Sequence, residues 1–305
     1  MVTPEMIQAF LSVVECGNIT LAANNLYTTQ SNLSKQIKLL ENELGVELLI
    51  RKKGHSSVSL TPYGKHFLQL SRDWESLMKE IYDLKNTRNI TEVSIGALDR
   101  LNSFTLTDFY NQILDQYTDI RIDTHTRHSR ELYRMMEASQ LDIALVTGIM
   151  PVSNLTVTPL YKEPMFVVCS KDTQLGKIVH PSDLDPDKEV FSRWSDEFEI
   201  WHDQYWPGKQ YRIHVGTTSM TPDYLNQKGR WSIMPVSTLR ALLQTKQFTH
   251  HALSEEPPKR TVYLLEQKHP RETRQAAIQL IRDQLIEYLL KDPYLEINPK
   301  IIKKK

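Results

Sequence analysis

The stretch from Asn18 to Val46 constrains the fold more than any other, because its pattern is that of two short helices joined by a tight turn. The first helix is expected after the turn signal Cys16-Gly17-Asn18, with Thr20 as its N-cap. Its Ala-rich inner side would be formed by Leu21, Ala22, Ala23 and Leu26. After Tyr27-Thr28-Thr29, apolar residues recur at steps of four, three and four, which predicts a second helix with one buried stripe of Leu33, Ile37, Leu40 and Leu44.

The other side of the second helix carries amides, hydroxyls and lysines, with no acidic residue before Glu41. Amides pair with adenine edges and lysines pair with phosphates, and helix-turn-helix proteins insert the start of their second helix into the major groove. The pattern therefore indicates DNA recognition. A polar helix face that only contacts water is the alternative.

Segments on both sides would complete such a unit. Residues 4 to 15 predict a supporting helix with Met6, Phe10, Val13 and Val14 inward. After Gly45 the pattern favours a two-stranded hairpin around Lys53-Gly54-His55, whose basic residues could contact phosphates, unless they form an ordinary basic turn. The residues expected to contact DNA are Thr20, Thr28, Thr29, Gln30, Ser31, Asn32, Ser34, Lys35, Lys38, Arg51, Lys52 and Lys53.

The charge balance makes any DNA contact local. The chain of 305 residues has 37 basic and 37 acidic side chains, so it has no global field that would attract nucleic acid. Residues 1 to 66 hold six basic and five acidic side chains, a net of one positive charge. We therefore expect affinity to depend on the second helix and the basic run from Arg51 to Lys53.

A strict heptad pattern begins at Tyr63 and predicts one long helix that ends near residues 86 to 89. An apolar seam of this kind packs against another helix, and a second copy of the chain is the simplest source of one. Packing against the chain's own C-terminal part is the alternative. The seam residues are Phe67, Leu70, Trp74, Leu77, Ile81 and Leu84.

From residue 92 onward, short apolar strands alternate with helical patterns. The strands are expected at VSIGA, IRIDTHT, Ile143 to Val146, FVVC, RIHV, WSIMP and VYLLE, with helices after Ser103, from Ser129, through Phe198, Trp201 and Tyr205, after Thr217-Thr218-Ser219, and through Ala277 to Tyr288. Alternation of this kind argues for a largely parallel α/β sheet, here in two lobes. A chain of this length can bury more than one core.

Several of these residues together resemble the LysR-type transcriptional regulators. The resemblance is carried by Ala22-Ala23, Leu26, Gln30-Ser31, Leu33-Ser34, Ile37, Leu40-Glu41, Leu44-Gly45-Val46, Leu48, Arg51, Leu60-Thr61 and Gly64, with weaker marks at residues 95 to 97, 141 to 145 and 235. The chain departs from the family at Ile50, where Phe is usual, at Lys35, where Arg is common, and at Lys228-Gly229-Arg230-Trp231, where a glycine-rich approach is usual. Lysine cannot form the planar fork of arginine, so base contacts there should be looser.

The resemblance implies an α+β multi-domain protein. It implies a winged helix-turn-helix at residues 1–61, a linker helix for dimerisation at 62–90, and a two-lobed α/β regulatory domain like periplasmic binding proteins, with lobe I at 91–160 plus 267–305 and lobe II at 161–266. The implied partners are double-stranded promoter DNA, a small-molecule effector in the cleft, and further copies of the chain as a homodimer or homotetramer. A constitutive or architectural DNA binder without an effector is the alternative.

In a two-lobed domain, the cleft lies at strand C-terminal ends and helix N-termini, which favour anions. Arg100, Arg127 and Arg193 could pair with a carboxylate, so an anionic effector is one option. Plain helix capping and a purely structural aromatic core would explain the same residues. The effector candidates are Ser103, Thr126, Arg127, His128, Thr147, Gly148, Trp194, Thr217, Thr218 and Trp231; the two tryptophans come from a dense group with Trp201 and Trp206.

The cysteines and the N-terminal residues limit the compartment in which the protein is expected and the reactions that it could catalyse. Cys16 and Cys169 form no metal or disulfide pattern, the first residues do not resemble a signal peptide, and no apolar run reaches membrane length, so we expect a cytoplasmic protein without membrane contact. Cys169 with His180, or His125 with His128, would be the basis of an enzyme, but neither pair has a supporting third group. We expect no catalytic residues, metal or cofactor.

Overall fold

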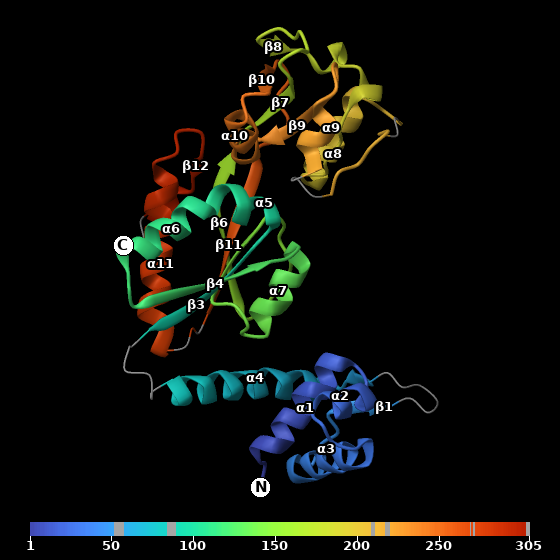
Figure 1. Ribbon diagram of the computed structural model, residues 1–305, viewed down its shortest axis with the longest axis vertical. Helices are drawn as coiled ribbons and strands as arrows, with labels where there is room; N and C mark the ends of the chain where they lie inside the picture. The colour runs from blue at the N-terminus through green and yellow to red at the C-terminus, as the bar shows by residue number, and fades with distance from the viewer. Residues whose placement is uncertain are drawn as a thin grey trace. The chain divides into compact units, whose positions relative to one another are not determined.

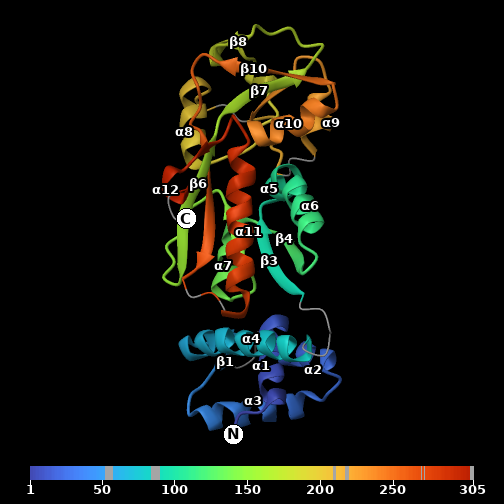
Figure 2. The ribbon, with the colours of Figure 1, turned by 90° about the vertical axis from the view of Figure 1, so that its left-hand side faces the viewer.

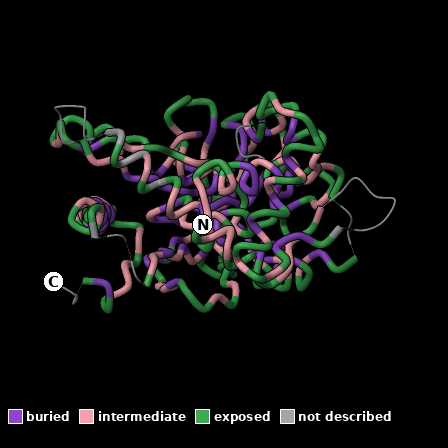
Figure 3. Tube along the Cα trace, turned by 90° about the horizontal axis from the view of Figure 1, so that it is seen from below, coloured by how far each residue is buried: buried purple, intermediate pink, exposed green. Residues whose placement is uncertain are grey.

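The computed structural model of the chain describes residues 1–51, 58–83, 90–208, 211–216, 220–268, 270 and 272–302. It divides into two compact units (Figure 1): the N-terminal one comprises Met1–Asn89 together with Glu137–Gln140, and the C-terminal one comprises Ile90–Met136 and Leu141–Lys305. Each unit has its own buried apolar core. Along many helices, buried and exposed stretches alternate, as amphipathic packing requires (Figure 3).

The N-terminal unit is a winged helix-turn-helix. Its three short helices surround one core, a two-stranded antiparallel hairpin follows, and a long helix ends the unit. The helix predicted at residues 4 to 15, the two joined helices and the hairpin are confirmed. The elements are α1 (Pro4–Cys16), α2 (Ile19–Asn25), α3 (Gln30–Leu44), β1 (Leu49–Arg51), β2 (Val58–Leu60) and α4 (Pro62–Asp83).

Side-chain caps fix where these helices begin. Asn18 caps α2, because its Oδ1 accepts hydrogen bonds from the backbone N–H of Thr20 at 2.7 Å and of Leu21 at 3.2 Å. The prediction that Thr20 is the cap was therefore wrong. Asn18 precedes the first helical residue in extended backbone, where a short amide reaches the free N–H groups. Thr29 caps α3 in the same way, through the N–H of Asn32 at 3.2 Å.

The core of this unit explains the spacing of its apolar residues. Leu33, Ile37 and Leu40 of α3 are fully buried, with Ala22 and Ala23 of α2 opposite them. The small alanines let α2 and α3 approach closely. Leu21 and Leu26 were predicted to face inward but are 54% and 38% exposed, because a seven-residue helix has only one narrow buried side.

Two contacts hold the wing hairpin against the helices. The Glu41 carboxylate accepts hydrogen bonds from the backbone N–H of Leu48 at 2.8 Å and of Leu49 at 3.1 Å, which joins α3 to β1. Gly64 in the first turn of α4 lies against the same segment. A Cβ there would be 2.0 Å from the Leu48 carbonyl oxygen, so only glycine permits this approach.

The apolar seam of α4 serves two purposes. Phe67 packs inside the unit, with its ring edge against Phe10 at a centroid distance of 5.1 Å. Farther along the helix, Leu70, Leu77 and Ile81 are 51%, 53% and 46% exposed. Trp74 is half-buried, and Leu84 lies outside the described residues. Phe67 therefore belongs to the core of this unit, and the contact of the exposed seam residues with another helix stays a prediction.

The C-terminal unit contains two sheets. In its described part, the larger sheet has six strands in the order β12-β6-β11-β5-β3-β4. Figures 1 and 2 both label β3, β4 and β6 of this sheet. The strands are β3 (Thr91–Ala97), β4 (Ile120–Thr126), β5 (Ile143–Val146), β6 (Leu155–Glu163), β11 (Arg260–Gln267) and β12 (Glu296–Ile297). Its helices are α5 (Asp99–Leu101), α6 (Thr107–Gln116), α7 (Ser129–Glu137), α11 (Glu272–Leu290) and α12 (Pro299–Ile302), with a π-helical turn at Asn102–Leu106.

The smaller sheet has four strands in the order β8-β10-β7-β9. Its strands are β7 (Met165–Ser170), β8 (Ile178–Val179), β9 (Trp231–Pro235) and β10 (Phe248–Leu253). The helices around it are α8 (Asp196–Tyr205), α9 (Thr221–Leu225) and α10 (Val236–Gln244), with single 3-10 turns at Pro181–Asp183 and Pro186–Lys188.

Three topological expectations need correction. The sheets are mixed: among the described strands, β3 pairs in parallel with β4 and with β5, and β8 with β10, while the other strand pairs within the two sheets are antiparallel. The segment RIHV, residues 212–215, does not form a strand of either sheet; its His214 makes an isolated β-bridge with Phe191. The chain also returns to the larger sheet earlier than the predicted position at residue 267, since β11 pairs with β6 from Arg260 onward and with β5 from Tyr263 onward.

The chain passes between the two sheets twice. Along β6 it runs through Glu163 and Pro164 directly into β7, and it comes back from β10 into β11 at Arg260. Glu163 and Arg260 are register partners at the ends of β6 and β11. The sheet topology therefore places the side chains of Glu163 and Arg260 next to each other at the point where the chain passes from one sheet to the other.

Candidate nucleic-acid interface and effector pocket

The outward face of α3 presents the predicted polar side chains. Gln30, Lys35 and Lys38 are exposed and Ser34 is half-buried. Residues 30, 34 and 38 follow one another at steps of four, so they lie on one side of the helix. Within the described part of the chain no hydrogen bond engages these four side chains, which leaves them available to a partner.

The first turn of α3 is organised by its own hydroxyls and amides. Asn32 donates through Nδ2 to the Thr28 hydroxyl at 2.9 Å, and the Thr29 and Ser31 hydroxyls lie 3.1 Å apart. These groups hold the turn before α3 in place. Their contribution to DNA binding stays a prediction, as does that of the exposed Thr20 on α2.

The wing is described only in part. β1 and β2 pair from Leu49 with Leu60 to Arg51 with Val58, so a hairpin follows α3 as predicted. The side chain of Arg51 and residues Lys52 and Lys53 lie outside the described residues. Their contact with DNA stays a prediction.

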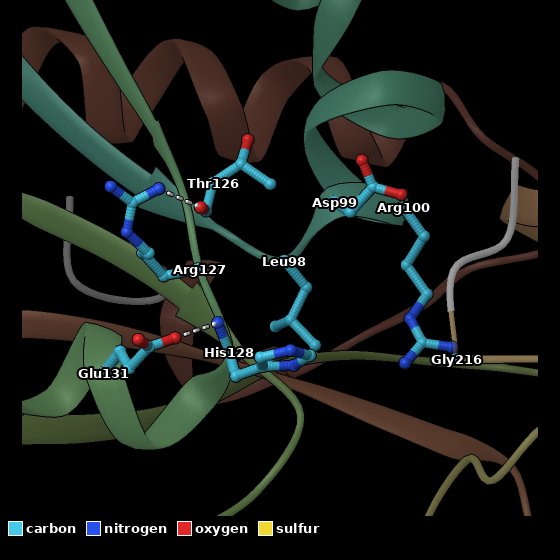
Figure 4. A pocket seen from close by; sticks show the side chains of 8 residues that line it. All are labelled: Leu98, Asp99, Arg100, Thr126, Arg127, His128, Glu131 and Gly216. Carbon is cyan, nitrogen blue, oxygen red and sulfur yellow. Dashed lines mark hydrogen bonds between the residues drawn. The ribbon is translucent and has the colours of Figure 1, made fainter.

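A cavity of about 380 Å³ lies in the C-terminal unit at the ends of two parallel strands (Figure 4). This volume suits a small metabolite. The chain leaves β3 through Leu98, Asp99 and Arg100, leaves β4 through Thr126, Arg127 and His128, and enters α7 near Glu131. Gly216, from the part of the chain that carries the smaller sheet, completes the lining.

Most charged groups around the cavity already have partners in the protein. Arg127 donates to the Thr126 carbonyl at 2.7 Å, and Glu131 accepts from the backbone N–H of His128 at 3.2 Å (Figure 4). The Asp99 carboxylate accepts from the Ser103 hydroxyl at 3.4 Å. Arg100 differs, because among the described residues no acceptor takes a hydrogen bond from its guanidinium, which lies over the Trp194 ring at 4.4 Å from the centroid.

Beneath Arg100 is a buried ion pair. Glu163 and Arg260 are 0% and 2% exposed, and Glu163 Oε1 accepts from Arg260 Nε at 2.8 Å and from Nη2. The other carboxylate oxygen accepts from the backbone N–H of Ser237 at 3.0 Å. Burial, followed by repulsion from Arg260, lowers the pKa of Arg100 to about 9, so Arg100 is still a cation at neutral pH.

The cavity includes three of the predicted effector residues, Thr126, Arg127 and His128, and excludes others. Ser103 lies inside the helical run that starts at Asp99 and does not cap it. Thr147 and Gly148 use backbone groups to contact Ser129 and Tyr133. Thr217 and Thr218 lie outside the described residues.

The tryptophan candidates are buried. Trp231 is 2% exposed and packs in the core of the smaller sheet, with its indole N–H donated to the Asp185 carbonyl at 2.8 Å. It is a core residue, so its selection as a pocket residue was wrong. Trp194 is 5% exposed and donates to the Ile233 carbonyl at 2.7 Å, and it supports Arg100 from below without lining the cavity.

Five lining residues were not among the effector candidates: Leu98, Asp99, Arg100, Glu131 and Gly216, of which Arg100 was named only as a possible partner of a carboxylate. Leu98 and Asp99 directly follow a predicted strand, so the rule that sites lie at strand C-terminal ends could have found them. Arg193, which was considered for a carboxylate effector, forms ion pairs with Asp196 at 2.7 Å and Glu199 at 2.8 Å. The positive charge of Arg193 is therefore already neutralised by these two carboxylates.

The residues considered for an enzyme do not form a reactive group. Cys169 is fully buried in β7, and burial raises the pKa of its thiol to about 11. A nucleophilic cysteine needs a lowered pKa and access to solvent. His180 accepts a hydrogen bond from the N–H of Ser182, and His125 pairs with Asp123 at 3.0 Å. In the described ranges no helix is both long and apolar enough to cross a membrane.

The fold and the two sites define a class of protein: a winged helix-turn-helix joined to a two-lobed α/β domain with a small-molecule cavity. Comparison with known families agrees. Residues 4–65 match the bacterial regulatory helix-turn-helix protein, lysR family, and residues 87–289 match the LysR substrate binding domain. The chain belongs to the LysR family of transcriptional regulators, whose members are not enzymes.

Individual proteins support this assignment. The chain is 30% identical over 180 residues to the uncharacterized HTH-type transcriptional regulator YybE of Bacillus subtilis, which covers 56% of this chain and 59% of YybE. The chain thus spans about half the length of the curated relatives that it matches.

Solved structures extend the similarity of the fold over almost the whole chain. Full-length LysG from Corynebacterium glutamicum with bound effector Arg has a TM-score of 0.64 at 16% identity, covering 98% of this chain and 100% of LysG. Full-length CbnR complexed with its target DNA has a TM-score of 0.61 at 16% identity, covering 95% and 99%. At these identities the similarity concerns the fold alone.

Proposed function

We propose that this LysR-family protein binds double-stranded promoter DNA through α3 and the wing, and that a small molecule in the cavity of the C-terminal unit switches its activity. The observation that carries the proposal is the outward face of α3. Gln30, Lys35 and Lys38 are exposed above a stripe of fully buried leucine and isoleucine side chains. Such a rigid helix can enter the major groove without rearrangement.

Further support comes from the relatives with the same fold. CbnR is described in complex with its target DNA and LysG with the effector Arg, so both kinds of ligand are compatible with this architecture. On this basis we assign residues 1–61 to DNA binding, 62–90 to a linker helix for dimerisation, and the remainder to the two regulatory lobes.

We also propose that α4 joins two copies of the chain. Leu70, Leu77 and Ile81 recur at helical spacing and are about half exposed. An apolar row of this kind on a long helix buries its surface when it packs against a second helix. Two copies joined in this way present paired α3 helices to a two-fold symmetric site. Assembly into a tetramer would require a further contact.

The DNA-binding proposal is tested by Gln30→Ala and Ser34→Ala. DNA sites are first selected from a random library with the wild-type protein, and the affinities of the variants for these sites and for scrambled DNA are then compared. We expect each variant to lose about 1–3 kcal/mol of discrimination where its side chain contacts a base edge.

Asn42→Ala is the matched control, because Asn42 is an exposed amide in the last turn of α3, far along the helix from Gln30 and Ser34. It should keep the affinity and the sequence preference of the wild type. If Gln30→Ala and Ser34→Ala also keep both, α3 is not the recognition helix.

The effector proposal is tested by thermal unfolding against a metabolite panel that includes neutral, cationic and anionic compounds. A ligand at a hundredfold excess over its dissociation constant stabilises the protein by about 2.7 kcal/mol. A compound that stabilises the protein and also changes its affinity for the selected DNA supports the proposal. DNA binding that no compound changes would indicate a constitutive binder.

A further inference from the structure

The charge pattern around the cavity points to the kind of molecule that it accepts. Arg100 lines the cavity, is half-buried, and lies with its guanidinium over the Trp194 ring. This stacking fixes the position of the cation but satisfies none of its N–H groups, since a ring face is not a hydrogen-bond acceptor of ordinary strength. A cation that is partly removed from water and has no acceptor is costly, so a structure that retains one favours an anionic partner.

The protein cannot supply that anion from its own buried groups. Glu163, the nearest fully buried carboxylate, is occupied by Arg260 on one oxygen and by the Ser237 N–H on the other. Arg260 also lies against Trp194, with its guanidinium carbon 5.4 Å from the ring centroid. The group around this indole therefore holds two guanidiniums and one carboxylate, which leaves one positive charge in excess.

The acidic residues of the cavity are also engaged elsewhere. Glu131 accepts the N–H of His128 at the start of α7, and Asp99 accepts the Ser103 hydroxyl. Figure 4 shows the Asp99 carboxylate and the Arg100 guanidinium pointing in different directions. Asp99 is close enough to favour the charged form of Arg100, but no hydrogen bond joins the two among the described residues.

We propose that the cavity recognises its effector through one carboxylate group, and that this carboxylate binds the guanidinium of Arg100. This inference rests on the proposed function, because it names the chemical class of the effector. Arginine can hold a carboxylate through two parallel hydrogen bonds in a single plane. The bound anion neutralises the excess charge next to the Glu163–Arg260 pair, and the remainder of the cavity is left for an uncharged part of the molecule.

The test uses the 305-residue chain and pairs of compounds of similar shape in which an amide replaces each carboxylate: acetate and acetamide, succinate and succinamide, benzoate and benzamide. Binding is measured by calorimetry and thermal unfolding for the wild type, Arg100→Met and Arg100→Lys. Crystals of the wild type and of Arg100→Met are soaked in sodium bromide, so that anomalous scattering locates bound anions whatever the natural effector is.

Arg193→Met is the matched control, because it also removes one arginine charge next to Trp194 in the sequence but its guanidinium pairs with Asp196 and Glu199 at the surface. We expect the wild type to prefer the carboxylate member of a pair by about tenfold or more, with a bromide ion beside Arg100. Arg100→Met should bind the carboxylate about tenfold to hundredfold more weakly and should lose the bromide. Arg100→Lys should recover part of the affinity for the carboxylate, and Arg193→Met should keep all of it.

Three results would overturn the inference: amides that bind as tightly as acids, carboxylate binding that survives in Arg100→Met, or no bromide and no carboxylate beside Arg100. These results are distinguishable from failure of the proposed function. A neutral or cationic metabolite that binds in the cavity and changes DNA affinity would leave the regulator assignment intact and reject only the carboxylate.

Discussion

The two units of this protein place their polar chemistry in opposite environments. In the N-terminal unit, α3 buries leucine and isoleucine and holds its amides and lysines in water. In the C-terminal unit, Glu163 and Arg260 are almost fully buried. Charges in water are screened by salt and interact weakly, whereas buried charges interact strongly and are costly when unpaired. The DNA affinity of the exposed α3 face should therefore depend on how many contacts it makes. The stability of the buried group should depend on whether each charged side chain keeps its partner.

The largest effect is expected from Glu163→Ala. This change leaves Arg260 buried without its acid and removes the acceptor of the Ser237 N–H. Breaking a buried ion pair costs about 3–5 kcal/mol. Urea unfolding of the full chain, followed by the fluorescence of the tryptophans between residues 194 and 231, should show a loss of that size.

Glu296→Ala is the control for this measurement. It breaks the ion pair between Lys259 and Glu296, both of which are more than one-third exposed. An exposed pair contributes about 0–1 kcal/mol, so the two acids should differ severalfold in their effect on the free energy of unfolding. If both variants lost the same free energy of unfolding, the burial of the Glu163–Arg260 pair would not make it stronger than the exposed Lys259–Glu296 pair.

A smaller effect is expected from Leu77→Asp on α4. The wild-type leucine is 53% exposed, and a charge in its place would be buried twice in a symmetric contact between two α4 helices. We expect the dissociation constant of the dimer to rise by about a hundredfold, as measured by sedimentation at a series of concentrations.

Leu39→Asp is the control, because Leu39 is a 42% exposed leucine on α3 and lies outside the apolar row of α4. It should sediment as the wild type does. A dimer that persists unchanged in Leu77→Asp would show that copies of the chain associate through another surface.

The same difference between the units explains how much the sequence could predict. The polar face of α3 and the stripe of Leu33, Ile37 and Leu40 were found because both depend on the period of a single helix. The cavity joins residues that follow β3, residues that follow β4, and Gly216, which are distant in the sequence. Thr126, Arg127 and His128 were found by the rule for strand ends. Leu98 and Asp99 follow β3 and could have been found by the same rule, whereas Glu131 and Gly216 required the strand order.

The error on the cap of α2 is local, whereas the errors on Trp231 and on the direction of the strands come from contacts between distant parts of the chain. Trp231 was considered a pocket residue because a tryptophan pattern does not reveal which side of a strand faces the core, and it is a core residue of β9. Thr20 was chosen as a cap although Asn18, two residues earlier, is the residue in extended backbone. The prediction of a largely parallel sheet was wrong because β11 runs antiparallel to both of its neighbours, β5 and β6. β6 and β11 are the strands through which the chain passes from one sheet to the other. Long-range pairing of this kind leaves no local pattern.

The smallest effect is expected from Lys38→Ala. Lys38 is exposed on α3, on the same side as Gln30 and Ser34, and no described residue accepts a hydrogen bond from it. As a phosphate contact it should contribute to all DNA sequences alike, so its loss should reduce the slope of log affinity against log salt by about one unit. Between 50 and 200 mM salt this amounts to about a fourfold change in relative affinity. A Lys38→Ala variant that changes sequence preference and keeps the salt slope would instead place Lys38 against a base edge, and the outward face of α3 would then read one more position of the DNA site.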